Sequence, residues 1–351
     1  MGELFRRGGP HNIRKTGRDQ YTFNISLPTD ADGIVGRECP NEECTPAYFR
    51  VKLGTGITGD DYDKAFCPYC RREGEPNDFL SQAQVDYGKN IVMNEVHAGV
   101  DRMIRDALGL GSSGRKKFGG GMISMEMSYK APRRRPVPRP YEEKLRRDVR
   151  CPKCTLEHSV FGLATWCPDC GEDIFVQHVE AELEVVTKML SQVEKRREEL
   201  GNRVAARDVE NALEDVVSIF EAVLKLVTRR HLQEQGQSEE DIAKVFKKDV
   251  RNTYQSVPRG AVLFEQLVGL PLFDGVEARF VSQLEETFEK RHPITHNLGV
   301  LDRKYLDKVR SGEKEGREVR VTADEIESAV ELVAQTIERA YLRAFPPASS
   351  E

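Results

Sequence analysis

The chain has 351 residues, of which 38% are hydrophobic and 32% charged, and its formal net charge is -5. This composition is typical of a soluble globular protein and argues against a disordered or membrane chain, and the length allows two or three domains. No run approaches the roughly 18 to 20 apolar residues of a membrane span. Because Arg6 and Arg7 are not followed by an apolar segment, we expect no secretory signal and a cytoplasmic protein.

The N-terminal part predicts a short β module followed by a helix. Residues 1–20 lack periodicity and are expected to be a disordered tail. Residues 21–80 contain two stretches of alternating apolar residues, near Tyr21 and near Phe49, as in half-buried strands. In residues 81–108 the apolar positions recur at helical spacing.

Residues 109–148 are predicted to be a basic Gly/Pro/Arg linker. Between Arg115 and Arg150 there are twelve Lys or Arg and four Asp or Glu. Such a strip neutralises phosphates and releases counterions, so it would add salt-dependent affinity for nucleic acid. The run Arg133, Arg134 and Arg135 is the candidate substrate-binding part. The alternative, a solvated spacer, stays open for the strip alone.

All eight cysteines fall into two quartets. The first is Cys39, Cys44, Cys67 and Cys70, and the second is Cys151, Cys154, Cys167 and Cys170. In a reducing cytosol such pairs do not persist as disulfides, and a Cys-x-x-Cys turn presents two sulfurs to one metal ion. We therefore expect two structural Zn²⁺ sites, in which four thiolates leave no open position for water. Unrelated buried thiols are the alternative.

The second quartet defines a further zinc ribbon over residues 149–174. Cys167 and Cys170 repeat the aromatic-Cys-Pro-x-Cys pattern that surrounds Cys67 and Cys70, and two copies of one module would explain this weak internal repeat. The first quartet departs from the ribbon pattern, because four residues separate Cys39 from Cys44. Both ribbons are candidate contacts for nucleic acid or for a protein partner.

Residues 175–345 are almost wholly helical in pattern. Apolar stripes at helical spacing predict four long amphipathic helices and a short one, which pack most simply as an antiparallel bundle. One of these stripes, which includes Leu284 and Phe288, ends at Arg291. Pro293 should kink or end that helix and direct His292 and His296 outward. The fold class expected is mainly α, a C-terminal antiparallel bundle preceded by two small β zinc ribbons and a helix.

The segment Arg291-His-Pro-Ile-Thr-His-Asn297 resembles the R-x4–6-H motif of the HEPN domain family, helical bundles many of which are metal-independent RNases. The resemblance covers residues 175–345 and implies a homodimer that cleaves RNA through the adjacent 2′-hydroxyl, in bacterial stress or phage defence. It implies that His296 moves protons and that Arg291 holds the scissile phosphate, while His292 or Asn297 orients them.

Other interpretations of this motif remain open. An Arg five positions before a His also occurs by chance in a chain of this composition, and Arg6 with His11 is an example. His296 and Asn297 could cap a helix, and Arg291 could form a surface ion pair. The competing function is a non-catalytic zinc-ribbon adaptor or sensor whose bundle serves dimerisation or RNA binding.

Overall fold

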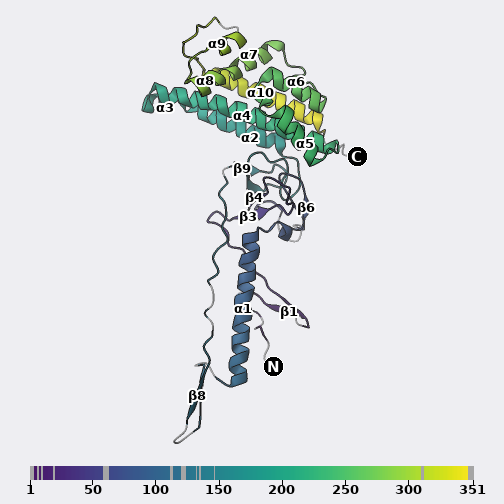
Figure 1. The fold of residues 1–351 in the computed structure, drawn as a ribbon, viewed down its shortest axis with the longest axis vertical. Coiled ribbons are helices and arrows are strands. Elements are labelled where there is room, and N and C mark those ends of the chain that lie inside the picture. The colour runs from purple at the N-terminus through teal and green to yellow at the C-terminus, as the bar shows by residue number, and fades with distance from the viewer. Residues whose placement is uncertain are drawn as a thin grey trace. The chain divides into compact units, whose positions relative to one another are not determined.

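The computed structural model describes residues 4–5, 8, 11–18, 20–57, 63–110, 114–119, 124–131, 133, 136–145, 147–309 and 312–346. The chain divides into two compact units. The cysteine unit comprises Met1–Gly162 and Trp166–Asp173, and the helical unit comprises Leu163–Thr165 and Ile174–Glu351. Figure 1 labels most of their elements.

The cysteine unit is organised around one four-stranded antiparallel sheet with the order β3-β4-β10-β9. Its strands are β3 (Ile34–Glu38), β4 (Tyr48–Lys52), β9 (Arg147–Arg150) and β10 (Glu157–Val160). Three two-stranded sheets accompany it: β1 (Arg14–Gly17) with β2 (Gln20–Thr22), β5 (Ala65–Phe66) with β6 (Glu73–Gly74), and β7 (Arg115–Phe118) with β8 (Met125–Ser128).

The central sheet joins the two segments that were expected to form separate ribbons. One hairpin, β3–β4, comes from residues 21–80, and the other, β9–β10, comes from the second cysteine segment. They meet where β4 pairs with β10, with Arg50 opposite Ser159. The two segments predicted as zinc ribbons therefore share one four-stranded sheet and form two halves of the same unit.

Helix α1 (Gln82–Leu108) lies between these halves in the sequence. It begins with a capping box in which Ser81 and Gln84 bond each other's backbone amides, and it ends at Gly109, whose φ of 63° suits glycine. The N-terminal segment packs along it, since the Arg102 guanidinium donates to the Leu4 carbonyl over 3.2 Å. Together with strand β1, this contact gives structure to part of the segment expected to be disordered.

We call the chain from the start of α1 to Glu142 the α1 excursion. Its two ends meet at the first hairpin, β3–β4, through Glu142. The Glu142 carboxylate accepts hydrogen bonds from Tyr48 Oη over 3.2 Å and from Gln84 Nε2 over 3.0 Å. Gln84 Nε2 also donates to the Gly36 carbonyl over 2.8 Å. We call these four residues the Glu142 clasp. It fixes the returning end of the segment that was expected to be a linker beside the start of α1.

The expected linker also contains the β7–β8 hairpin, in which Arg115, Lys116 and Lys117 are exposed. Among the candidate substrate-binding arginines, Arg133 is exposed. Arg134 and Arg135 lie outside the described residues.

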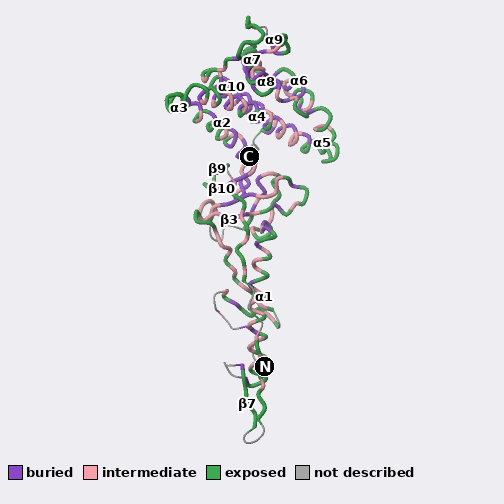
Figure 2. The backbone as a smooth tube through the Cα atoms, turned by 60° about the vertical axis from the view of Figure 1, so that its left-hand side comes forward, coloured by how far each residue is buried: buried purple, intermediate pink, exposed green. Residues whose placement is uncertain are grey.

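The described residues of the helical unit contain one apolar core drawn from most of its helices, and Figure 2 shows the buried positions along them. The helices are α2 (Phe175–Ser191), α3 (Val193–Leu200), α4 (Asn202–Glu234), α5 (Glu239–Val245), α6 (Val257–Val268), α7 (Ala278–Glu289), α8 (Arg291–Asn297), α9 (Arg303–Lys308) and α10 (Ala323–Ala344). A π-helix, Phe246–Val250, and a short 3-10 helix, Thr253–Gln255, connect α5 to α6.

The buried stripes of α2, α4 and α10 are the ones that the sequence periodicity indicates. They include Leu183 of α2, Phe220 of α4 and Val333 of α10, each at most 2% exposed. The mainly α character is thereby confirmed. Among the described residues, no helix has both the length and the hydropathy of a membrane span.

Candidate metal centres and candidate active site

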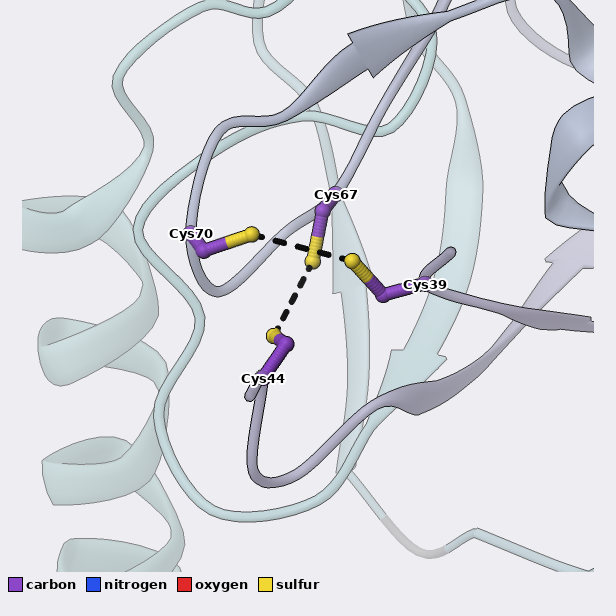
Figure 3. Close-up of side chains that lie close together, drawn as sticks. All are labelled: Cys39, Cys44, Cys67 and Cys70. Atoms are coloured by element: carbon purple, nitrogen blue, oxygen red, sulfur yellow. Dashed lines mark hydrogen bonds between the residues drawn. The ribbon is translucent and has the colours of Figure 1, made fainter. Parts of the chain in front are cut away.

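The first cysteine quartet converges from two loops. Cys39 and Cys44 follow β3, and Cys67 and Cys70 follow β5. The sulfurs of Cys39 and Cys70 lie 3.7 Å apart, as do those of Cys44 and Cys67, and Figure 3 shows all four side chains directed at one point.

The second quartet has the same arrangement. Cys151 Sγ lies 3.7 Å from Cys170 Sγ, and Cys154 Sγ lies 3.4 Å from Cys167 Sγ. In both quartets every pair of sulfurs falls within 4.8 Å. All eight cysteines are free, and these separations are far longer than a disulfide bond of about 2.05 Å.

These separations fit a tetrahedral metal–thiolate centre. Metal–sulfur bonds of about 2.3 Å in a tetrahedron place the sulfurs about 3.8 Å apart. The two groups are therefore geometrically suited to bind one metal ion each, as the spacing of the cysteines predicts.

The four thiols of the first quartet differ in acidity. Hydrogen bonds from neighbouring thiols, that of Cys44 onto Cys39 and that of Cys39 onto Cys70, lower the pKa of Cys39 and of Cys70. The hydrogen bonds that Cys44 and Cys67 share with Cys39 raise the pKa of both thiols. The four thiols therefore do not ionise alike, and a bound divalent ion would stabilise all of them as thiolates.

The two quartets are built by the same local hydrogen bonds. The Cys39 amide donates to the Ala47 carbonyl over 2.9 Å, and the Cys151 amide to the Leu156 carbonyl over 2.9 Å. The second turns match as well, with the Cys67 amide bonded to the Arg72 carbonyl and the Cys167 amide to the Glu172 carbonyl, each over 2.9 Å. The weak sequence repeat thus corresponds to a repeated structure.

The halves also hold each other at their Cys-Pro turns. The Phe66 amide donates to the Pro168 carbonyl over 2.7 Å, and the Trp166 amide donates to the Pro68 carbonyl over 3.1 Å. Tyr69 adds a third link, because its hydroxyl accepts from the Phe161 amide over 2.9 Å. The Cys-Pro turn of each quartet is therefore held by backbone that belongs to the other half.

Aromatic side chains also make contacts between the two halves. The Trp166 ring of the second half carries the Arg71 guanidinium of the first, 4.2 Å from its centroid. The Phe66 ring of the first half covers Gly171 of the second, where an added Cβ would meet three ring atoms at 3.1 Å. Arg71 and Gly171 are equivalent positions, with φ of 62° and 63°.

Arg71 and Gly171 should therefore respond differently to substitution. Gly171→Ala should destabilise the cysteine unit by about 1–2 kcal/mol, because alanine is disfavoured at positive φ and its Cβ crowds Phe66. Arg71→Gly should be nearly neutral, since relieved backbone strain offsets the lost contact with Trp166. Denaturant unfolding, followed by fluorescence of Trp166, the single tryptophan, measures both. Equal effects of the two substitutions would contradict this account.

Arg291, at the start of α8, is half-buried against the connection between α5 and α6. Its Nη1 donates to Gln255 Oε1 over 3.0 Å, and Gln255 Nε2 donates to Glu221 Oε2 over 2.8 Å. Arg291 Nε is buried and has no hydrogen-bond partner among the described residues. Arg291 is thus held by an amide and does not form the surface ion pair considered from the sequence.

His292 and His296 lie together on another side of α8. Their ring centroids are 5.0 Å apart, with His292 half-buried and His296 exposed. His292 Nε2 lies 3.9 Å from Asp302 Oδ2, which accepts a hydrogen bond from Asn297 Nδ2 over 3.3 Å. Burial, and to a lesser extent Lys304, lower the pKa of His292. The arrangement is an imidazole pair with a nearby carboxylate, and His292 is biased toward its neutral form.

The helix separates Arg291 from this imidazole pair. The helix is interrupted one turn before Pro293, since α7 ends at Glu289 and α8 begins at Arg291 with Pro293 in its first turn. Residues four apart on an α-helix differ in direction by about 40°, whereas residues five apart differ by about 140°. His292 and His296 therefore share a face, and Arg291 and His296 of one chain do not.

Two residues at this surface were missed by the sequence reasoning. Gln255, which contacts Arg291, lies far from it in the chain and carries no local signal. Asp302 precedes α9 and accepts from the Tyr305 amide over 2.8 Å, so a helix-capping signal was available.

Comparison with protein-family models, with curated proteins and with solved structures found no match.

Proposed function

We propose that this protein is a metal-independent endoribonuclease whose cysteine unit is held together by two Zn²⁺ ions. The observation that carries the proposal is the imidazole pair formed by half-buried His292 and exposed His296, adjacent in sequence to the guanidinium of Arg291. Imidazoles exchange protons near neutral pH, and a guanidinium binds phosphate.

The reaction proposed is transesterification of RNA. The 2′-hydroxyl oxygen attacks the adjacent phosphorus and loses its proton to an imidazole, while the bond from phosphorus to the 5′-oxygen breaks. A second imidazole protonates that leaving oxygen, so the products carry a 2′,3′-cyclic phosphate and a 5′-hydroxyl. Arg291 stabilises the charge on the phosphate oxygens. His292 is suited to accept the proton, because its lowered pKa keeps it neutral.

A homodimer belongs to the proposal for a geometric reason. Since Arg291 and His296 of one helix diverge by about 140°, one chain alone does not direct both groups at the same phosphate. Two copies of α8 facing each other across a twofold interface would pair the arginine of one chain with the histidine of the other.

Zinc is the metal we assign to both quartets. Four thiolates suit Zn²⁺ and leave no position for water, so the ions stabilise structure and take no part in the chemistry. Eight free cysteines agree with a reducing compartment, and we place the protein in the cytoplasm, where defence or stress nucleases act on RNA.

The test is cleavage of single-stranded RNA in magnesium-free buffer with EDTA added at the start of the reaction. We expect cutting that leaves cyclic-phosphate ends, and loss of cutting when the residue 5′ to the scissile bond is a 2′-deoxynucleotide. Cleavage that depends on added Mg²⁺, or that leaves 5′-phosphates, would contradict the proposed chemistry.

The orientation of Arg291 favours a second candidate function. Its hydrogen bond to Gln255 and its divergence from His296 are also what a structural arginine would show. The protein would then be a non-catalytic adaptor that binds RNA, or a partner, through exposed basic residues such as Arg115, Lys116 and Arg133. RNA binding without cleavage by the wild-type protein would select this function.

A further inference from the structure

A line of four side chains runs from α4 to Arg291. Lys225 Nζ donates to Glu221 Oε1 over 2.6 Å, and Gln255 Nε2 donates to Glu221 Oε2 over 2.8 Å. Gln255 Oε1 then accepts from Arg291 Nη1 over 3.0 Å. The amide of Gln255 thus lies between a carboxylate and a guanidinium.

The chemistry of the two neighbours fixes the orientation of this amide. A carboxylate only accepts hydrogen bonds and a guanidinium only donates them. The NH₂ group of Gln255 must therefore face Glu221, and its oxygen must face Arg291. The reversed orientation would lose both bonds.

The consequence is that Arg291 keeps an uncompensated charge. Glu221 is paired with Lys225, and the amide separates it from the guanidinium. The neighbouring cation, Lys290, is by contrast neutralised by Glu325 over 2.6 Å. Within the part of the chain that the structure describes, Arg291 has no ion-pair partner. A half-buried arginine held by a neutral acceptor is unusual, because such charges are ordinarily paired.

The backbone that carries Gln255 is firmly anchored. Tyr254 beside it is fully buried, and its hydroxyl shares a 2.7 Å hydrogen bond with Thr228 of α4. Gly260 of α6 packs closely on Tyr254, with an added Cβ only 3.4 Å from its Cα. The position of the amide is therefore set by the core of the helical unit.

We propose that Gln255 is a positioning residue that holds Arg291 through a neutral acceptor and so leaves its positive charge available to an RNA phosphate. The inference rests on the proposed function, because it assigns a role within the same site. It identifies a residue on a separate element, 36 positions before Arg291, that controls the electrostatics of the phosphate contact.

The test is Gln255→Glu, which preserves shape and places a carboxylate against Arg291. The probe is a fluorescent single-stranded RNA with 2′-O-methyl groups, which cannot be cleaved, and its affinity is measured by anisotropy over a series of salt concentrations. We expect Gln255→Glu and Arg291→Ala each to weaken binding about tenfold and to reduce the salt slope by about 1, as for the loss of one phosphate contact.

Two control variants separate this effect from general changes in charge or folding. Gln233→Glu makes the same substitution at an exposed glutamine that also donates to a carboxylate, that of Glu239. Lys290→Arg changes the adjacent side chain and keeps the charge that pairs with Glu325. Both should bind the probe within about twofold of wild type. Gln255→Leu, which removes the hold on Arg291 without adding charge, should weaken binding less than Gln255→Glu and leave the salt slope nearly unchanged.

The outcomes distinguish the inference from the function on which it rests. If Arg291→Ala weakens binding and Gln255→Glu does not, the role of Gln255 is overturned and the phosphate contact stands. If Arg291→Ala binds as wild type does, Arg291 contacts no phosphate and the inference fails. Absence of binding by the wild type would overturn both the inference and the proposed function.

Discussion

Replacing Cys67 with serine should empty the first metal site and weaken the second about 100-fold, although the second quartet keeps all four sulfurs. The cause is that each half of the cysteine unit holds the Cys-Pro turn of the other half by a backbone hydrogen bond. Loss of the first site frees the Pro68 carbonyl from Trp166, the Pro168 carbonyl from Phe66, and Arg71 from Trp166. Each contact contributes about 1 kcal/mol, and about 1.4 kcal/mol corresponds to a tenfold change in affinity.

Competition with a chromophoric zinc chelator measures both affinities, and Trp166 fluorescence reports the second half directly. Cys167→Ser should have the reciprocal effect on the first site. The matched control is Tyr69→Phe, which removes the hydroxyl bonded to Phe161 and retains every sulfur, so both metals should stay bound with a modest loss of stability. Wild-type affinity at the second site of Cys67→Ser would show that the halves bind metal independently.

Single substitutions at α8 should nearly abolish RNA cleavage. We expect Arg291→Ala and His296→Ala each to reduce the rate by about 10²–10³, the usual effect of removing a charge-stabilising group or a proton-transfer group. His97→Ala, an exposed histidine of α1, is the control and should cut at the wild-type rate. Cleavage kinetics under single-turnover conditions measure all three. Wild-type cleavage by Arg291→Ala or His296→Ala would refute the active-site assignment.

A mixing experiment tests the geometry behind this prediction. A dimer of one Arg291→Ala chain and one His296→Ala chain has two sites. If each site takes its arginine from one chain and its histidine from the other, one of the two sites keeps both groups. After subunit exchange, an equal mixture should recover about a quarter of the wild-type activity. A site made within one chain would recover none.

The sequence predicted the features of this protein that depend on nearby residues. Cysteine spacing identified both quartets, because the ligands within each turn are close in the chain. The stripes of α2, α4 and α10 were predictable, because each long helix buries one face. Helix α6 was not, since Pro258 and Gly260 suggest a break, whereas Pro258 occupies the first turn and Gly260 packs against Tyr254 within the helix.

The remaining features depend on contacts between distant segments. Nothing near Arg50 or Ser159 indicates that β4 and β10 pair across more than a hundred residues. The contact between Gln255 and Arg291 is of the same kind, since neither residue predicts the other. Whether the R-x4-H resemblance reflects a nuclease depends on a second chain and stays a prediction.

The Glu142 clasp has a consequence for how this protein can change over evolution. The clasp joins the start of α1 to the segment around Glu142. The length of the chain between these two points can therefore change without moving the cysteine-bearing halves. Insertions or deletions in the excursion change only a loop-closure entropy that grows slowly with length. We therefore expect relatives of this chain to differ in the length of the α1 excursion and to keep the spacing of the repeated cysteine turns.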